Sequence, residues 1–152
     1  MLGLVLSGVT AFPLQSETTV LLRFAVRLHL NQHTPNLVAW IARVHSALAN
    51  TGAHFPFLAY GTDWLAFAHI VIAVAFFGPW LDPIRNRWVV TFGLIACLGV
   101  LPLALIAGPI RGIPFFWRLI DCSFGVVGAV PLALVRRRIA QLESALSSPQ
   151  PM

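Results

Sequence analysis

An arginine and an aspartate, Arg118 and Asp121, interrupt the last long apolar run of the chain. On a helix they lie about 60° from one another, and their face continues through small residues that predict packing inside a helix bundle: Cys122, Gly125, Gly128 and Ala129. An unpaired charge within a bilayer costs about 3 kcal/mol on insertion scales. Two interpretations stay open, a site for a ligand, proton or substrate, or a salt bridge that fixes the helix register.

His69 is a second polar residue inside an apolar run. It has about the same predicted depth as Asp121 in a run that crosses in the same direction, so the two side chains meet if their helices are neighbours. An imidazole oriented by a carboxylate is what a proton relay or a metal site requires. The alternative is a histidine bonded to a backbone carbonyl or to Tyr60.

These residues predict a polar pocket near one membrane face. Its candidate ligand-binding residues are Tyr60, His69, Arg111, Arg118 and Asp121. His29 and His33 are four residues apart, but no cysteine or carboxylate cluster joins them, so we expect no metal site and no cofactor. The sequence contains no nucleophile elbow, P-loop, dinucleotide fingerprint or zinc-protease motif, which argues against an enzyme and leaves no catalytic residue to assign.

The composition indicates a membrane protein. Of the 152 residues, 58% are hydrophobic and 10% are charged, and the mean hydropathy is +0.82. Soluble domains are about 45–50% apolar and about 25% charged. The formal net charge is +5, but the arginines form no compact basic face, so nucleic acid is not an expected partner. The expected partners are the lipid bilayer and either a membrane-protein partner or a second copy in a homodimer.

Three apolar runs, each near the twenty residues that a membrane helix needs, are predicted to span the bilayer: 62–80, 88–107 and 114–135. Their short connections make neighbouring spans antiparallel. Asp63 is expected to cap the start of the first span. Pro102 and Pro131 lie within spans and predict kinks.

The N-terminal third is predicted to carry one short apolar helix and two amphipathic helices. Residues 1–14 reach about 20 Å against a bilayer core of about 30 Å, and a short membrane helix is favoured over a signal peptide because no positive charge precedes the apolar run. A start downstream of the native one would also explain the missing turns. Residues 17–30, capped by Ser16, place Thr19, Arg23 and Arg27 in a polar stripe, and a second helix runs from Thr34–Pro35 to Gly52.

The predicted fold class is all-α, an integral membrane four-helix bundle with three full spans plus a short N-terminal one, and two amphipathic extracytoplasmic helices. We expect one membrane domain, 1–138, with 15–61 as its extracytoplasmic insert, and a cytoplasmic tail, 139–152, disordered from Leu142. Arginines 85, 87 and 136–138 mark the cytoplasmic side. Both termini are therefore expected in the cytoplasm.

The runs YGTDWLAFAHIVIA (60–73) and LALIAGPIRGIPFFWRLIDCSFG (103–125) resemble an uncharacterised family of small bacterial multi-pass inner-membrane proteins. The likeness covers residues 53–138 best. It implies a bacterial inner (plasma) membrane location. It also implies that the family members carry the same polar positions as this chain and have a longer N-terminus. It implies no particular activity.

Three functions are compatible with this pattern. The leading hypothesis is an inner-membrane protein that binds a partner or a small ligand in the outer-leaflet polar pocket. The first alternative is a membrane enzyme acting on lipid or quinone, with His69 and Asp121 as acid and base and Arg118 binding an anionic headgroup. The second is a proton-coupled small-solute carrier, which at this length would have to dimerise.

Overall fold

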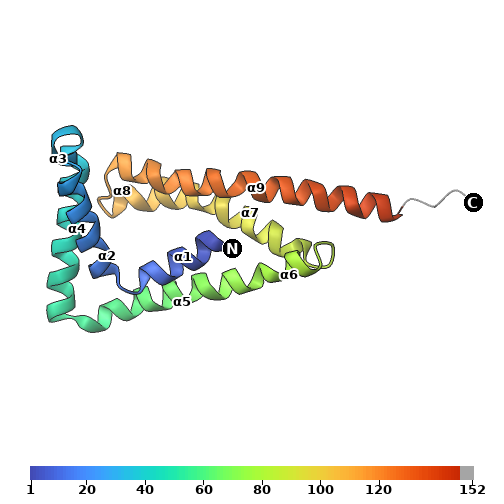
Figure 1. Ribbon diagram of the computed structural model, residues 1–152, viewed down its shortest axis with the longest axis horizontal. Helices are drawn as coiled ribbons and strands as arrows, with labels where there is room; N and C mark the ends of the chain where they lie inside the picture. The colour runs from blue at the N-terminus through green and yellow to red at the C-terminus, as the bar shows by residue number, and fades with distance from the viewer. Residues whose placement is uncertain (148–152) are drawn as a thin grey trace, which may run out of the picture. The chain divides into compact units, whose positions relative to one another are not determined.

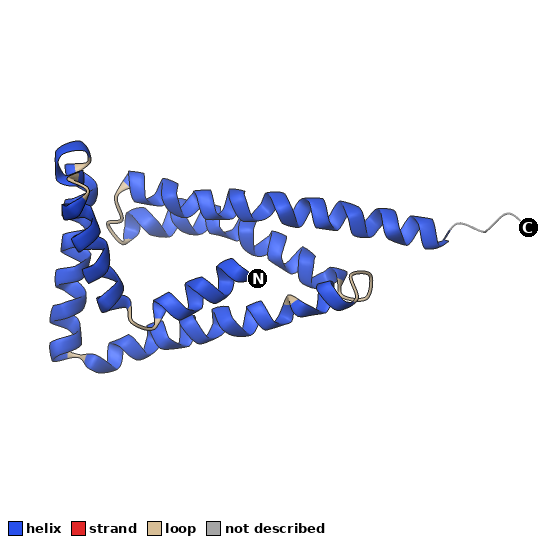
Figure 2. Ribbon diagram, in the orientation of Figure 1, coloured by secondary structure: helices blue, strands red, loops and turns tan. Residues whose placement is uncertain are grey.

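The computed structural model describes residues 1–147, which form helices and short connections without any strand (Figures 1 and 2). In chain order the elements are α1 (Leu2–Ala11), α2 (Leu14–Arg27), α3 (Leu30–His33), α4 (Pro35–His54), the 3₁₀ turn η1 (Pro56–Leu58), α5 (Ala59–Ala75), α6 (Phe77–Leu81), α7 (Arg87–Pro102), the π-helical turn η2 (Leu103–Ala107), α8 (Gly108–Ile110) and α9 (Phe115–Ser147). The all-α prediction is therefore confirmed for this part of the chain.

Three helical stretches are long and apolar enough to cross a membrane: Pro56–Leu81, Arg87–Ile110 and Phe115–Ser147. Each contains or closely overlaps one predicted span, whereas α1, with 10 residues, is shorter than a bilayer core is thick. The 33 residues of α9 extend about 50 Å, roughly 20 Å more than that core. The expectation of a disordered tail from Leu142 is therefore wrong up to Ser147, and residues 148–152 lie outside the described residues.

The C-terminal half of α9 is helical because it packs against the start of α7. Ile139 is only 3% exposed. Arg87 donates to both carboxylate oxygens of Glu143 at 3.0 Å, and Arg136 donates to Thr91 Oγ1. These contacts come from residues about fifty positions away, so the local Ser/Pro composition could not reveal them.

The chain divides into two compact units, Met1–Val74 and the residues from Ala75 onward. In the first unit α2 and α4 lie side by side, and α1 lies along α5 (Figure 1). The contact between α1 and α5 is close, because a Cβ atom at Gly8 would stand 2.8 Å from Ile70 Cγ1 and 2.9 Å from the Ala66 carbonyl oxygen.

In the second unit α7 and α9 form an antiparallel pair that uses the small-residue face of α9. A Cβ atom at Gly125 would stand 2.6 Å from the Cys97 carbonyl oxygen, and one at Gly128 would stand 3.0 Å from Cys97 Sγ. Glycine at these positions lets the two backbones approach closely, as in membrane helix pairs. The predicted inward orientation of this face is therefore confirmed at Gly125 and Gly128.

Several predicted helix ends differ from the observed ones. Thr34 and Pro35 do open a helix, α4. Ser16 is not a cap, because α2 already begins at Leu14 after Pro13. Gly52 does not end α4, which continues to His54. Asp63 does not cap α5 either, since that helix begins at Ala59 and leaves the carboxylate beyond its first turn.

The two prolines that predict kinks have different surroundings. Pro102 ends α7, and the π-helical turn Leu103–Ala107 follows it directly. A proline ring clashes with the carbonyl group four residues earlier and supplies no N–H donor, so the regular α-helical hydrogen bonds are interrupted there. Pro131 lies within α9, which continues on both sides of it.

Candidate functional site

Arg118 lies at the start of α9 with its side chain running along α8. A Cβ atom at Gly108 would stand 2.5 Å from Arg118 Cδ and 2.9 Å from Arg118 Cγ. Gly108 is buried, and the arginine stem occupies the space that any larger residue there would fill. The turn between α8 and α9 makes this contact possible, because Gly112 adopts a left-handed φ of 70° that glycine tolerates best.

The guanidinium group of Arg118 has an aromatic neighbour but an unsatisfied donor. Its Cζ atom lies 5.2 Å from the centroid of the Phe115 ring, a cation–π arrangement. Its Nε atom is buried and has no hydrogen-bond partner among residues 1–147. A buried donor without an acceptor costs about 1–3 kcal/mol. Within residues 1–147 the guanidinium group therefore has no ion-pair partner, and its Nε donor has no acceptor.

Asp121 does not supply that partner. Although it lies one turn further along α9, no ion pair joins it to Arg118; the ion pair present in residues 1–147 is Arg87–Glu143. Side chains on a helix lean toward its N-terminus, and Arg118 accordingly extends toward Phe115 and Gly108, away from Asp121. The salt-bridge interpretation of the pair is therefore not what the structure shows.

His69 is engaged with its own helix. Its Nδ1 atom lies 2.7 Å from the Leu65 carbonyl oxygen, and since a carbonyl only accepts, Nδ1 carries the proton and donates. The imidazole is half-buried beside α1, with its Cβ 3.3 Å from the position that a Cβ atom at Gly8 would take. This is the backbone-carbonyl interpretation of His69. Nε2 makes no hydrogen bond within the described residues, and in this tautomer it can accept one from an external donor.

Tyr60 belongs to an aromatic group at the start of α5. It is 61% exposed, and its ring meets Trp64 edge-on at 6.0 Å, while Trp64 meets Phe67 edge-on at the same distance. Tyr60 precedes His69 by nine residues, about 13 Å along the helix. The two side chains therefore do not form a common site, and the aromatic group resembles an interfacial belt.

Arg111 ends α8, where its amide donates to the carbonyl oxygens of Ala107 and Gly108, and its side chain is exposed. It belongs to the same unit as Arg118 and Asp121, whereas Tyr60 and His69 belong to the other. The structure adds two residues that sequence reasoning missed, Gly108 and Phe115. A Gly-Pro pair just before the turn and an aromatic ring three residues before an arginine were the available signals.

No three histidine, cysteine, aspartate or glutamate side chains gather as metal ligands within residues 1–147. His29 has a left-handed φ of 52° at the break between α2 and α3, so His29 and His33 do not share one continuous helix. The local arrangement best suited to bind a ligand is Arg118 with Gly108 and Phe115, and the chemistry it suits is recognition of an anionic or carbonyl oxygen. Comparison of the chain with protein-family models, with curated proteins and with solved structures finds no match.

Proposed function

We propose that the chain is a multi-pass inner-membrane protein that binds a small ligand or a membrane-protein partner through a polar pocket at the outer leaflet, and that Arg118 binds an anionic group of that ligand or partner. The observation that carries this proposal is the buried, unpartnered Nε of an arginine whose direction is set by Gly108. In this proposal the stretches Pro56–Leu81, Arg87–Ile110 and Phe115–Ser147 contain the full spans, and α1 is the short fourth helix of the bundle.

Exposed apolar side chains support the membrane location. In each of the three long apolar stretches, only 6–17% of the most hydrophobic 18-residue segment is buried within the chain. On α9, for example, Phe124 is 69% exposed and Val127 is 71% exposed. Water would penalise such surfaces by about 25 cal/mol per Å², whereas acyl chains would not. A bilayer is the solvent that this surface suits.

The distribution of arginine supports the orientation. The α7–α9 pair has Arg85 and Arg87 at the end where Arg136 and Glu143 contact α7, and Arg111 and Arg118 at the opposite end. Lysine and arginine in short loops favour the cytoplasm, so the first end is assigned to the cytoplasmic face. Arg118 lies about 5 Å from the start of α9, at a depth where carboxylate and phosphate groups have access.

Extraction in mild detergent tests this proposal. The full chain, Arg118→Gln, and Arg137→Gln as a matched control are purified identically, and retained small molecules and proteins are identified by mass spectrometry. Arg137 carries the same charge on the same helix but lies in the other half of α9. The proposal expects one anionic species or partner on the wild type and on Arg137→Gln, depleted at least tenfold on Arg118→Gln. Equal retention by all three proteins would overturn it.

A further inference from the structure

One face of α2 packs against α4. Thr18 and Ala25 are 6% and 2% exposed, and Leu22, between them on the same face, is half-buried. Thr19 Oγ1 lies 3.0 Å from His45 Nε2 of α4. These contacts fix the rotation of α2 about its own axis, and they therefore determine which residues point away from the hairpin.

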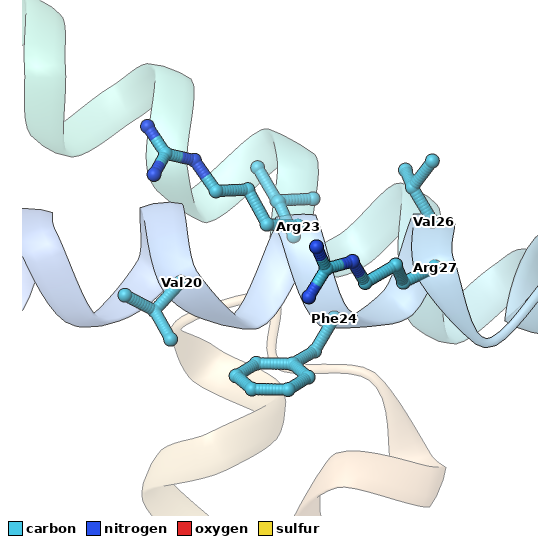
Figure 3. Close-up of a pocket in the computed structure, with 6 residues that line it drawn as sticks. Val20, Arg23, Phe24, Val26 and Arg27 are labelled. Carbon is cyan, nitrogen blue, oxygen red and sulfur yellow. The ribbon is translucent and has the colours of Figure 1, made fainter.

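The opposite side of α2 combines two arginines with two apolar side chains. At 100° per residue, Arg23 and Arg27 lie about 140–180° from Thr18, and Val20 and Phe24 follow at about 200–240°. All four are exposed, Val20 by 47% and Phe24 by 55%. They are among the six α2 residues that line a pocket (Figure 3). We call Val20, Arg23, Phe24 and Arg27 the outer face of α2.

The outer face has cations but no anion to neutralise them. Between residues 15 and 61 the charged side chains are three arginines, at 23, 27 and 43, and one acid, Glu17, which gives 3 − 1 = +2. Glu17 lies in the first turn of α2, where the helix dipole favours a carboxylate. No ion pair involves Arg23 or Arg27 within the described residues. The outer face is therefore complementary to a negatively charged surface.

The first unit also orients this face relative to a span. α4 continues through η1 into α5, and α4 runs across the direction of α5, with α2 beside it (Figure 1). If α5 follows the membrane normal, α2 and α4 lie along the membrane surface. Phe55 and Phe57, at the corner between α4 and α5, are 53% and 70% exposed, as expected of side chains at an interface.

We propose that the outer face of α2 is a binding surface for the headgroups of acidic phospholipids, with the two guanidinium groups on the phosphate and Val20 and Phe24 in the upper acyl region. This proposal rests on the membrane location proposed above but not on the Arg118 site. Two arginines one turn apart provide paired donors for phosphate oxygens, and an adjacent apolar stripe is the pattern of an interfacial helix. A phospholipid thus differs from soluble phosphate as a ligand, because its acyl chains can also contact Val20 and Phe24.

Native mass spectrometry of the full chain in detergent tests the proposal, with phosphatidylglycerol and phosphatidylcholine as probes. The test variant is Arg23→Gln/Arg27→Gln, and the control is Arg43→Gln, which removes an exposed arginine from α4. A basic residue near an anionic surface contributes about a fivefold factor, so the double variant should retain phosphatidylglycerol about 25-fold less well. Arg43→Gln should retain it as the wild type does, and phosphatidylcholine should bind weakly to all three.

Several results would overturn the proposal. One is equal phosphatidylglycerol retention by the double variant and the wild type. Another is an equal loss in Arg43→Gln, which would mean diffuse charge attraction without a defined face. Displacement of the lipid by inorganic phosphate alone, or loss of a dimer without any change in lipid retention, would assign the face to a soluble anion or to a second copy. Unchanged Arg118-dependent ligand retention in the double variant separates this test from that of the proposed function.

Discussion

Gly108 of α8 and Arg118 of α9 are in contact across the turn that joins their helices. A Cβ atom at Gly108 would stand 2.5 Å from Arg118 Cδ, closer than real side chains approach. The arginine stem therefore occupies the space that a side chain at position 108 would take. The direction of the guanidinium group depends on that glycine, although the two residues are ten positions apart.

Gly108→Ala should displace Arg118 without changing any charge. We expect retained ligand to fall to the level of Arg118→Gln, while the free energy of unfolding changes little, because the atoms that the added methyl group meets belong to the flexible Arg118 side chain, which can move aside. Gly99→Ala is the control, since nothing lies within 4 Å of a Cβ atom there. Ligand retention by mass spectrometry and unfolding in mixed micelles give the two readouts. Full retention by Gly108→Ala would show that the glycine does not position the arginine.

Gly125→Ala should weaken the α7–α9 pair. The added methyl group would meet the Cys97 carbonyl oxygen at 2.6 Å, and a backbone atom cannot rotate away. We expect a loss of about 1–3 kcal/mol in the free energy of unfolding, measured by tryptophan fluorescence during titration with a denaturing detergent. Gly99→Ala should be unchanged or gain up to about 1 kcal/mol from helix propensity. Equal stability of the two variants would contradict the close approach of α7 and α9.

Arg87 and Glu143 should couple weakly but measurably. Their side chains are 62% and 29% exposed, so water screens the pair, and a double-mutant cycle with Arg87→Gln and Glu143→Gln should give about 0.2–1 kcal/mol. Limited proteolysis supplies a second readout, because a helical α9 protects the chain up to Ser147. Zero coupling together with rapid cleavage near Ile139 would argue against an α9 that stays helical to Ser147.

Thiol labelling should place the two ends of the α7–α9 pair on opposite sides of the membrane. Cysteines introduced as Arg85→Cys and Ile110→Cys, in a chain whose Cys97 and Cys122 are replaced by alanine, occupy exposed positions at those ends. A membrane-impermeant reagent should reach Ile110→Cys in intact cells and Arg85→Cys only after the membrane is opened. Reaction of both positions from one side would contradict a crossing by α7.

The long helices were predictable because their signals are local. A run of about twenty apolar residues indicates a helix long enough to cross a membrane, and a Thr-Pro pair marks the start of α4, without any knowledge of the tertiary structure. The extension of α9 was not predictable in the same way, since Arg136 and Glu143 are held by Thr91 and Arg87 of α7. Sequence composition at a helix end carries no information about a distant partner.

The candidate site was predictable only in part for a similar reason. The spacing of Arg118 and Asp121 correctly places them on neighbouring positions of one helix, but it does not determine where a long side chain turns. Gly108 and Phe115 determine the direction of the Arg118 side chain, and the α8–α9 turn brings Gly108 close enough to do so. On α2 the predicted polar stripe is divided, because Thr19 bonds to α4 whereas Arg23 and Arg27 stay exposed.

The NMR signal of the Arg118 Nε–H group tests most directly whether Arg118 binds an anion. In the ¹⁵N-labelled full chain in micelles, this signal is identified by its loss in Arg118→Lys, and its chemical shift is compared before and after bound molecules are stripped by a harsher detergent. We expect the Arg118 signal to shift on stripping while the Arg137 signal does not, because loss of an anion from the guanidinium group changes the surroundings of its buried Nε–H donor. An Arg118 signal with the same shift before and after stripping would contradict anion binding by Arg118.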